Sequence, residues 1–290
     1  MAIAPAKSPS GLTIIAGGGQ MPLKVANAAT SAGRAVHIFA LRGAAEPEIE
    51  NFSHTWINFG HIGKILSVSK AENCGEMVIV GSARRPRLAD LRIDFGALWS
   101  LPSLLGLMAG GDNSVLTGII EFFESKGFKV LGAHEIAPEL MAGKGVFSRR
   151  RPGKADRKDI AIGLEVIAAL GALDVGQATV VAQQYVLAVE AAEGTDRMLQ
   201  RCKDLNKWGK SGSRKRSGVL VKCAKPGQER RIDLPTVGPE TIRHASKAGL
   251  AGIAIAANEV LIVDREQFIK AADDAGLFVI GVDMQDGKPA

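Results

Sequence analysis

The sequence of 290 residues is poor in cysteine and in aromatic side chains, and both shortages restrict its class. Its three cysteines, Cys74, Cys202 and Cys223, are too few and too scattered for a disulfide framework or a structural zinc site, which predicts a reducing compartment. Aromatic residues make up 5% of the chain, so its core must consist of Ala, Val, Ile and Leu. That composition is typical of a buried parallel sheet covered by helices.

Membrane-spanning runs and targeting signals are also lacking. No apolar run is long enough to cross a bilayer. Residues 1–10 lack the apolar centre of a signal peptide, so we expect a disordered lead-in there and a cytoplasmic protein. The stretch 95–109 (FGALWSLPSLLGLMA) is apolar but too short to span. It indicates either a core or interdomain helix or a wall for acyl chains or the membrane surface.

Two common hydrolase signatures are missing. The five histidines show no metal-ligand spacing, and there is no G-x-S-x-G motif. Both absences disfavour serine-hydrolase chemistry and dinuclear, histidine-rich phosphoesterase chemistry.

Positive charge is concentrated in one segment. The chain carries a formal net charge of +6, but residues 197–231 contain twelve basic residues and two acidic ones. Such a segment predicts an anionic partner, which could be a nucleic acid, a phosphorylated ligand or an anionic membrane face. A solvated basic loop over 203–217 is the alternative.

The order of apolar runs and turn residues predicts two α/β domains. Strands and helices alternate over 11–142, which indicates a Rossmann-like doubly wound parallel sheet. The basic stretch 143–158, broken by Gly and Pro, is the expected linker. Residues 159–290 are expected to form a second α/β domain with a mixed sheet. Its predicted helices cover 159–170, 195–205, 239–248 and 265–275, and its predicted strands cover 178–182, 185–189, 219–222, 253–256, 260–263 and 278–282.

A glycine turn follows the first predicted strand. Gly17, Gly18, Gly19 and Gln20 precede a helix that begins at Pro22. Backbone N–H groups in such a turn can approach a phosphate at the positive end of the helix, although a tight structural turn explains the pattern equally well. The turn is not a dinucleotide fingerprint, because Pro22 stands where the third glycine should be.

Further polar groups follow later strands. Ser82, Arg84 and Arg85 come directly after the fourth predicted strand, where arginine offers bidentate phosphate recognition. Carboxylates gather in 190–196, and Lys, Arg and carboxylate side chains alternate in 222–233. Carboxylates near cations are what divalent-metal phosphoryl chemistry needs, and salt-bridged surface carboxylates are the alternative.

Taken in order, the motifs resemble those of the UDP-2,3-diacylglucosamine diphosphatases of the LpxI type. They are IIAGGGQMP (14–22), GHIGK (60–64), GSARRP (81–86), GDN (111–113), LDVGQATVV (173–181), EAAEGTDRMLQR (190–201), VLVKCAKPGQERRIDLPTVGP (219–239) and GLAGIAI (249–255). The resemblance implies two domains with the substrate between them. It also implies Mg²⁺-dependent hydrolysis of the substrate's pyrophosphate to UMP and 2,3-diacylglucosamine 1-phosphate (lipid X) during lipid A synthesis.

The resemblance also suggests which residues act. Asp233 matches the family's essential carboxylate, and we assign it to catalysis through metal binding or water activation. Glu193 and Asp196 are the other predicted Mg²⁺ ligands. The predicted substrate-binding residues are Gly17, Gly18, Gly19, Gln20, Ser82, Arg84, Arg85, Thr195, Lys222, Lys225, Gln228 and Arg231. We also expect transient contact with the cytoplasmic face of the inner membrane, no nucleic-acid partner and a possible homodimer.

Two other function classes are open at this stage. An NADP-dependent reductase would use Arg42, near the end of the second predicted strand, for the 2′-phosphate. A non-enzymatic nucleic-acid-binding protein would use the basic segment, although the scarcity of aromatics for base stacking argues against it.

Overall fold

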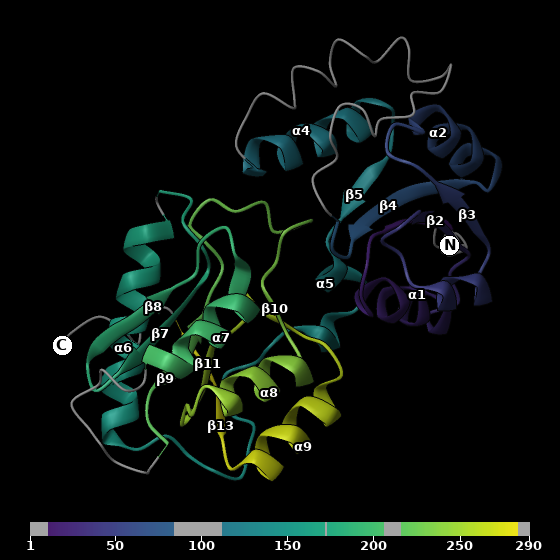
Figure 1. Cartoon of the computed structure of the whole chain (residues 1–290). Helices are drawn as coiled ribbons and strands as arrows, with labels where there is room; N and C mark the ends of the chain where they lie inside the picture. The colour runs from purple at the N-terminus through teal and green to yellow at the C-terminus, as the bar shows by residue number, and fades with distance from the viewer. Residues whose placement is uncertain (1–10, 84–111, 172, 206–215, 284–290) are drawn as a thin grey trace, which may run out of the picture. The chain divides into compact units, whose positions relative to one another are not determined.

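The computed structural model describes residues 11–83, 112–171, 173–205 and 216–283. The chain divides into two compact units (Figure 1). The first unit runs to Pro138 and also contains Glu229–Asp233, and the second holds Glu139–Gln228 and the chain from Leu234 onward. The predicted lead-in and the apolar stretch 95–109 lie outside the described residues. The predicted α/β class is confirmed.

The first unit contains five parallel strands in the order β3-β2-β1-β4-β5. Figure 1 shows α1 and α5 on one face of this sheet and α2 and α4 on the other, which is the predicted Rossmann-like arrangement. Buried residues of β2, β4 and α4, among them Phe39, Met77 and Phe123, form the core beneath α2 and α4. The elements are β1 (Gly11–Ala16), α1 (Met21–Ser31), β2 (Val36–Leu41), β3 (His54–Ile57), α2 (Ile62–Ala71), β4 (Cys74–Val80), α4 (Asp112–Ser125), β5 (Lys129–Leu131) and α5 (Ala133–Ile136).

The second unit contains the mixed sheet that the sequence predicts. Its strand order is β6-β13-β11-β9-β7-β8, in which β9, β11 and β13 are parallel and β6, β7 and β8 pair antiparallel. The elements are β6 (Gly145–Val146), α6 (Lys154–Gly171), β7 (Ala178–Ala182), β8 (Tyr185–Val189), α7 (Gly194–Leu205), β9 (Val219–Lys222), β10 (Thr236–Val237), α8 (Pro239–Lys247), β11 (Gly252–Ala256), β12 (Leu261–Ile262), α9 (Arg265–Ala275) and β13 (Phe278–Val282).

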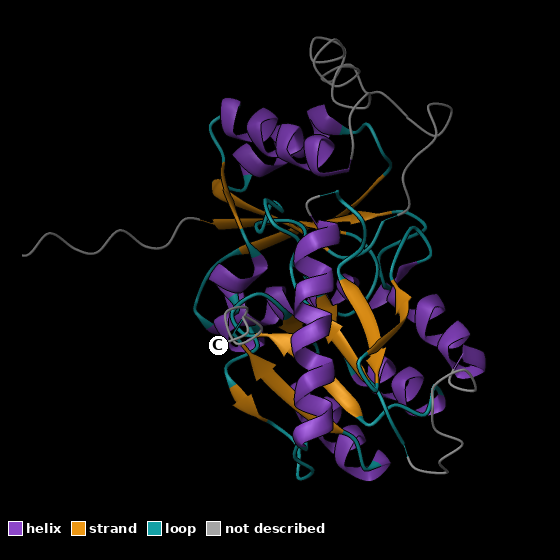
Figure 2. Ribbon diagram, turned by 90° about the vertical axis from the view of Figure 1, so that its left-hand side faces the viewer, coloured by secondary structure: helices purple, strands orange, loops and turns teal. Residues whose placement is uncertain are grey.

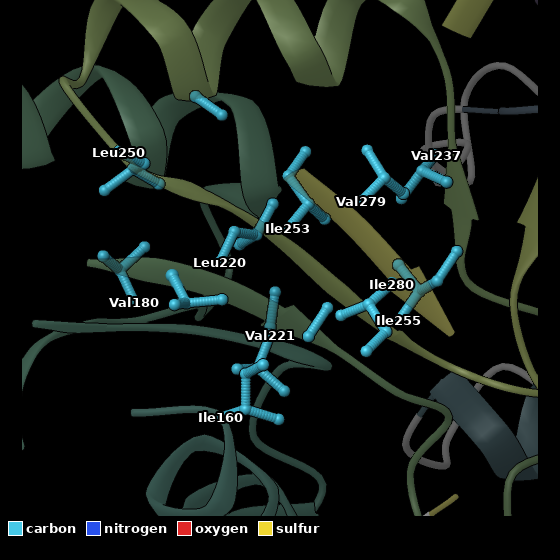
Figure 3. Close-up of a cluster of buried hydrophobic side chains, with 14 of the residues drawn as sticks. Ile160, Val180, Leu220, Val221, Val237, Leu250, Ile253, Ile255, Val279 and Ile280 are labelled. Atoms are coloured by element: carbon cyan, nitrogen blue, oxygen red, sulfur yellow. The ribbon is translucent and has the colours of Figure 1, made fainter. Parts of the chain in front are cut away.

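Helices cover both faces of this sheet. The long helix α6 lies across β7 and β9, as Figure 2 shows, and Gly163 lets it approach the side chain of Val221 closely. The helices α7, α8 and α9 pack on the opposite face. Figure 3 shows the result: Ile160 of α6 meets Val221 on one side of the strands, while Leu220 meets Ile253 on the other. Aliphatic side chains dominate this core, but Met198, Phe268 and Phe278 are also fully buried in it, so the expectation of a core made of Ala, Val, Ile and Leu alone is too narrow.

Some element boundaries differ from the prediction. The helix expected from residue 159 begins at Lys154, so the stretch 143–158 holds β6 and the first turn of α6. The strand expected over 260–263 is β12, which pairs with β10 in a separate two-stranded sheet and forms one antiparallel bridge with Met141. Two-residue strands such as β6 and β10 leave no periodic pattern in a sequence, which is why they were not predicted. None of the described helices is long and apolar enough to cross a membrane.

A buried carboxylate shapes the β7–β8 hairpin. Gln183 and Gln184 form its turn with φ angles of +53° and +63°, a left-handed conformation that non-glycine side chains rarely adopt. Asp159 of α6, only 3% exposed, accepts hydrogen bonds from the backbone N–H groups of Gln183 (3.0 Å) and Gln184 (2.6 Å). Burial raises the pKa of Asp159, and these two donors oppose the rise. The carboxylate therefore holds the turn in its strained conformation.

Replacing Asp159 with alanine is expected to lower the free energy of unfolding by about 1–3 kcal/mol, because two part-buried hydrogen bonds to a charged acceptor are lost. Urea denaturation measures the change. Glu165→Ala is the matched control, since Glu165 is an exposed carboxylate on the same helix and its loss should change stability by less than about 0.5 kcal/mol. Equal effects of the two substitutions would contradict this role of Asp159.

Candidate functional site

The first unit places its glycine turn where the strand order reverses. From β1 the chain proceeds to β2 on one side of the sheet, whereas β4 and β5 lie on the other side of β1. Ligands of doubly wound sheets bind at this switch point, outside the carboxyl ends of the strands. The loops that follow β1 and β4, residues 17–20 and 81–82, therefore occupy the position expected of a ligand site.

Backbone contacts join these two loops. Gly18 N–H donates to the Ser82 carbonyl at 2.7 Å, and Ser82 N–H donates back to the Gly18 carbonyl at 2.9 Å. A Cβ on Gly17 would lie 2.5 Å from the carbonyl oxygen of Ser82. A Cβ on Gly81, whose φ is +99°, would lie 2.8 Å from the backbone of Gly17. Packing alone thus requires these glycines, as the tight-turn interpretation supposed, and their lack of side chains also opens the backbone to a ligand.

The start of α1 adds positive character to this loop. Its N-cap, Gln20, makes no side-chain capping bond, and its first turn holds no acidic residue. The exposed Gly19 N–H donates to a carboxylate oxygen of Glu46 at 3.2 Å. A loop amide that already binds a carboxylate, beside the positive end of a helix, favours anionic groups. Arg84 and Arg85, predicted to bind substrate here, lie outside the described residues.

Asp233 lies in a short turn that belongs to the first unit, although second-unit residues flank it in the sequence. The N–H groups of Ile232 and Asp233 both donate to the Glu229 carbonyl, at 3.2 and 3.0 Å. The side chain of Ile232 packs against the hydrophobic cluster that contains Phe123. These contacts hold the half-buried Asp233 on the first unit.

Arg231, in the same turn, is paired with carboxylates. Its Nε and Nη2 donate to the two carboxylate oxygens of Glu229 at 3.0 and 2.9 Å, and its Nη1 donates to Glu124 of α4 at 2.8 Å. The hydrogen bond from Arg231 lowers the pKa of Glu229, and the same bond raises the pKa of Arg231. Both groups are therefore charged at neutral pH.

In the second unit, the ends of three strands bring polar residues to one edge. Lys222, the last residue of β9, pairs in register with Ala178, the first residue of β7. Glu190, directly after β8, donates its N–H to the Ala178 carbonyl at 2.8 Å. The carboxyl ends of the parallel strands β9, β11 and β13 share this edge. It is therefore the edge at which an α/β sheet binds ligands.

A buried chain of hydrogen bonds lies at this edge. Lys222 Nζ donates to Thr195 Oγ1 at 2.9 Å, and Thr195 Oγ1 donates to Glu190 Oε1 at 2.9 Å. The other Glu190 oxygen accepts from Gln177 N–H at 3.2 Å. Lys222, Thr195 and Glu190 are only 8%, 9% and 7% exposed. Buried charges require such partners, and the chain brings the predicted residues Lys222 and Thr195 together.

The K-P-G-Q segment after β9 is a tight turn. Pro226 and Gly227, whose φ is +74°, occupy its two central positions, and Gln228 N–H donates to the Lys225 carbonyl at 3.2 Å. The Gln228 side chain reinforces the turn by accepting from Lys225 N–H at 2.8 Å. Lys225 Nζ donates to the carboxylate of Asp174. Two further predicted substrate-binding residues are thus held near Lys222 by the chain itself.

The three predicted metal ligands do not come from one unit. Glu193 and Asp196 belong to the second unit and Asp233 to the first. Glu193 accepts hydrogen bonds from Arg201, which together with backbone N–H groups lower its pKa, and Asp196 lies 3.0 Å from His244 Nδ1. Within the described ranges, no group of three or more His, Cys, Asp or Glu side chains is arranged to hold a metal ion.

Glu190 was counted among the clustered carboxylates of 190–196 but was not named as a site residue, and the structure places it at the end of the buried chain. Its signal was a glutamate directly after the apolar strand YVLAV. Its place is fixed by Gly176, where a Cβ would lie 2.0 Å from the Glu190 carbonyl oxygen. A close backbone contact of this kind cannot be deduced from residue spacing.

The cysteines are not candidates for nucleophilic catalysis. Burial raises the pKa of Cys202 to about 11 and also raises the pKa values of Cys74 and Cys223. Thiolate is the reactive form, so none of the three supplies a nucleophile near neutral pH.

Fold and polar groups together define a class: a two-unit α/β protein in which each unit carries polar groups at the carboxyl edge of its parallel strands. Comparison with known proteins gives the family. The model of the LpxI N-terminal domain matches residues 11–140, and that of the LpxI C-terminal domain matches residues 143–280. The chain therefore belongs to the LpxI family, and the resemblance seen in its motifs is confirmed.

One curated relative covers both units. It is the UDP-2,3-diacylglucosamine pyrophosphatase LpxI of Caulobacter vibrioides. The two sequences are 42% identical over 275 residues, which are 95% of this chain and 98% of the relative.

Proposed function

We propose that this protein is a hydrolase that cleaves the pyrophosphate of UDP-2,3-diacylglucosamine to UMP and 2,3-diacylglucosamine 1-phosphate (lipid X) in lipid A synthesis. The observation that carries this proposal is the 42% identity, across both units, to a relative named for that pyrophosphatase activity. The polar groups at the two sheet edges support it, because hydrolysis of a pyrophosphate requires its negative charge to be neutralised.

We assign charge neutralisation mainly to the second unit. Lys222 Nζ, held by Thr195 in a buried position, has the charge and the donors to bind a phosphate oxygen. Lys225 and Gln228 follow it in a fixed turn and are proposed to bind the same phosphates. From the first unit, we propose that Ser82 and the backbone of Gly17, Gly18, Gly19 and Gln20 bind substrate, together with Arg84 and Arg85.

Asp233 is the proposed catalytic residue. Hydrolysis adds water across the bridging P–O bond: the water oxygen bonds to one phosphorus, the bridging oxygen leaves with the other, and the water proton must be removed. A carboxylate can accept that proton or hold a metal ion that binds the water. The backbone bonds that close the Glu229–Asp233 turn position this carboxylate before substrate arrives.

We also propose that the reaction requires Mg²⁺. The described residues contain no ready-made cluster of three or more ligand side chains, which fits a Mg²⁺ held by one or two carboxylates together with substrate phosphates. Asp233 is the first proposed ligand. Glu193 and Asp196 stay as further predicted ligands, and they would have to leave Arg201 and His244 to bind. When bound, the ion supplies positive charge to the phosphates and lowers the pKa of water.

The acyl chains of the proposed substrate determine where in the cell the protein would meet it. We propose that the chain works in the cytoplasm at the face of the inner membrane, where such a lipid is held, with transient membrane contact and as a possible homodimer. Vesicle flotation with and without acylated substrate tests the membrane contact.

Genetic complementation tests the function. A bacterial strain depleted of its own UDP-2,3-diacylglucosamine hydrolase should grow when this chain is expressed, and should not grow when the Asp233→Ala variant is expressed at the same level. Failure of the unaltered, folded chain to restore growth and to hydrolyse the purified substrate would overturn the proposal.

Replacing Lys222 with methionine is expected to lower kcat/KM about 10- to 100-fold, because one charge-assisted hydrogen bond to a phosphate oxygen, worth about 1.5–3 kcal/mol, is lost. Methionine keeps most of the side-chain volume at this buried position. Initial rates of UMP release measure the effect. Lys270→Met, at an exposed lysine of α9 in the same unit, is the matched control and should leave kcat/KM unchanged. A wild-type value for Lys222→Met would remove Lys222 from the site.

A further inference from the structure

The side chain of Arg231 links the turn that carries Asp233 to the rest of the first unit. Arg231 bonds Glu229 through Nε and Nη2 and bonds Glu124 of α4 through Nη1, so all three nitrogens of its guanidinium donate to carboxylates. Glu229 lies within the turn, whereas Glu124 lies 107 residues earlier in the sequence. The second bond therefore links the turn to a rigid helix of the unit.

The turn that the Arg231–Glu124 pair links to α4 is short. The turn comprises only Glu229–Asp233, and the chain belongs to the second unit immediately before and after it. Apart from Arg231, its attachment includes the packing of Ile232 on the cluster around Phe123. Arg231 and Ile232, the two residues directly before Asp233, thus contribute to the position of its carboxylate.

Charge argues against phosphate binding by Arg231. One guanidinium faces two carboxylates, so the group formed by Arg231, Glu229 and Glu124 carries a net charge of −1 when all three are ionised. A group with net negative charge repels a phosphate, whereas it can hold an arginine in a fixed position.

We propose that Arg231 is a positioning residue that, with Glu229 and Glu124, fastens the Asp233 turn to α4, rather than a residue that binds the substrate's phosphates. This inference rests on the proposed role of Asp233 in hydrolysis. It replaces the sequence-based assignment of Arg231 to the substrate. Glu124, which belongs to none of the sequence motifs, then affects catalysis through the position of Asp233.

The two roles of Arg231 predict opposite results for Glu124→Gln. If Arg231 positions the turn, loss of the Glu124 carboxylate loosens Asp233 and lowers kcat, because displacement of a reacting group by about 1 Å costs up to about 100-fold in rate. If Arg231 binds phosphate, the same change frees its guanidinium, so KM should fall and kcat should not.

The experiment compares Glu124→Gln with Glu121→Gln, an exposed carboxylate on the same helix. For Glu124→Gln we expect kcat to fall about 5- to 20-fold with KM unchanged, an effect within the range of positioning losses. We also expect faster hydrogen exchange at the amides of Ile232 and Asp233. The control should match the unaltered protein in both measurements. A lower KM with undiminished kcat, or unchanged exchange at both amides, would overturn the proposal.

A double-variant cycle separates this inference from the proposed function. If Glu124 acts through Asp233, Glu124→Gln should cause no further loss in an Asp233→Asn background, because coupled residues are not additive. A further loss equal to that of the single variant would contradict positioning. If the unaltered protein shows no hydrolysis at all, the proposed function fails, while hydrogen exchange still tests whether Glu124 holds the turn.

Discussion

Replacing Asp233 with asparagine is expected to lower kcat about 10³-fold, within the 10²- to 10⁴-fold contribution of a positioned acid or base. Asparagine has nearly the same shape, so the backbone bonds from Ile232 and Asp233 to Glu229 should persist. What is lost is the negative charge that accepts a proton or binds a metal ion. Steady-state release of UMP from the acylated UDP-sugar measures the loss.

Controls separate this loss from misfolding. The variant should keep the circular-dichroism spectrum and the urea midpoint of the unaltered protein. Asp204→Asn removes an exposed carboxylate of α7 and should leave kcat unchanged. If Asp233→Asn retains full activity, Asp233 has no part in the chemistry, and the assignment of this turn to the site is wrong.

Removal of Mg²⁺ is expected to have the second large effect. With EDTA in excess, the rate should fall at least about 100-fold, and added Mg²⁺ should restore it, because the ion supplies several kcal/mol of charge stabilisation to a phosphoryl transition state. Full activity after exhaustive chelation would contradict the metal requirement.

Metal binding should also depend on the nucleotide. Because Mg²⁺ is usually held by one or two carboxylates together with substrate phosphates, it is expected to bind weakly to the protein alone and more tightly once a diphosphate is present. Titration calorimetry with Mg²⁺ alone and with UDP measures this difference. Equal, tight binding in both titrations would indicate a metal site made by protein groups alone.

Sequence patterns predicted most of the fold because apolar runs, glycine turns and helical segments follow one another in a regular order. In the first unit, short apolar strands separated by glycine turns and helices leave few alternatives to a doubly wound sheet. In the second, the predicted strands 178–182 and 185–189 are separated only by Gln183 and Gln184, and they pair as a hairpin. The strand expected over 260–263 was assigned correctly in type, but its partner strand β10 was too short to recognise.

The candidate site could be predicted only where it is local in sequence. The K-P-G-Q turn fixes Lys225 and Gln228 through contacts within four residues, so its motif was informative. The Lys222–Thr195 bond and the Arg231–Glu124 pair join residues 27 and 107 positions apart. Residue types and spacing do not encode such pairs, which is why Arg231 was assigned to phosphate and Glu124 to nothing.

The sequence also gives no sign that the Asp233 turn packs on the first unit, because the residues that it contacts are far away in the sequence. Residues 229–233 pack on the first unit, although the residues directly before and after them in the sequence belong to the second unit. Four of the five residues of Glu229–Asp233 are charged, but charge alone does not tell which unit a turn packs against. The packing of Ile232, the bonds of Arg231 and the close approach of Gly132 to the Arg231 backbone show where this segment lies.

The most direct test is to identify the products. Purified protein, UDP-2,3-diacylglucosamine and Mg²⁺ are incubated together, and the mixture is analysed by mass spectrometry. We predict UMP and 2,3-diacylglucosamine 1-phosphate in equal amounts, with neither formed by Asp233→Asn. Formation of UDP and a free acylated sugar, or unchanged substrate with protein that is folded and supplied with metal, would contradict hydrolysis of the pyrophosphate.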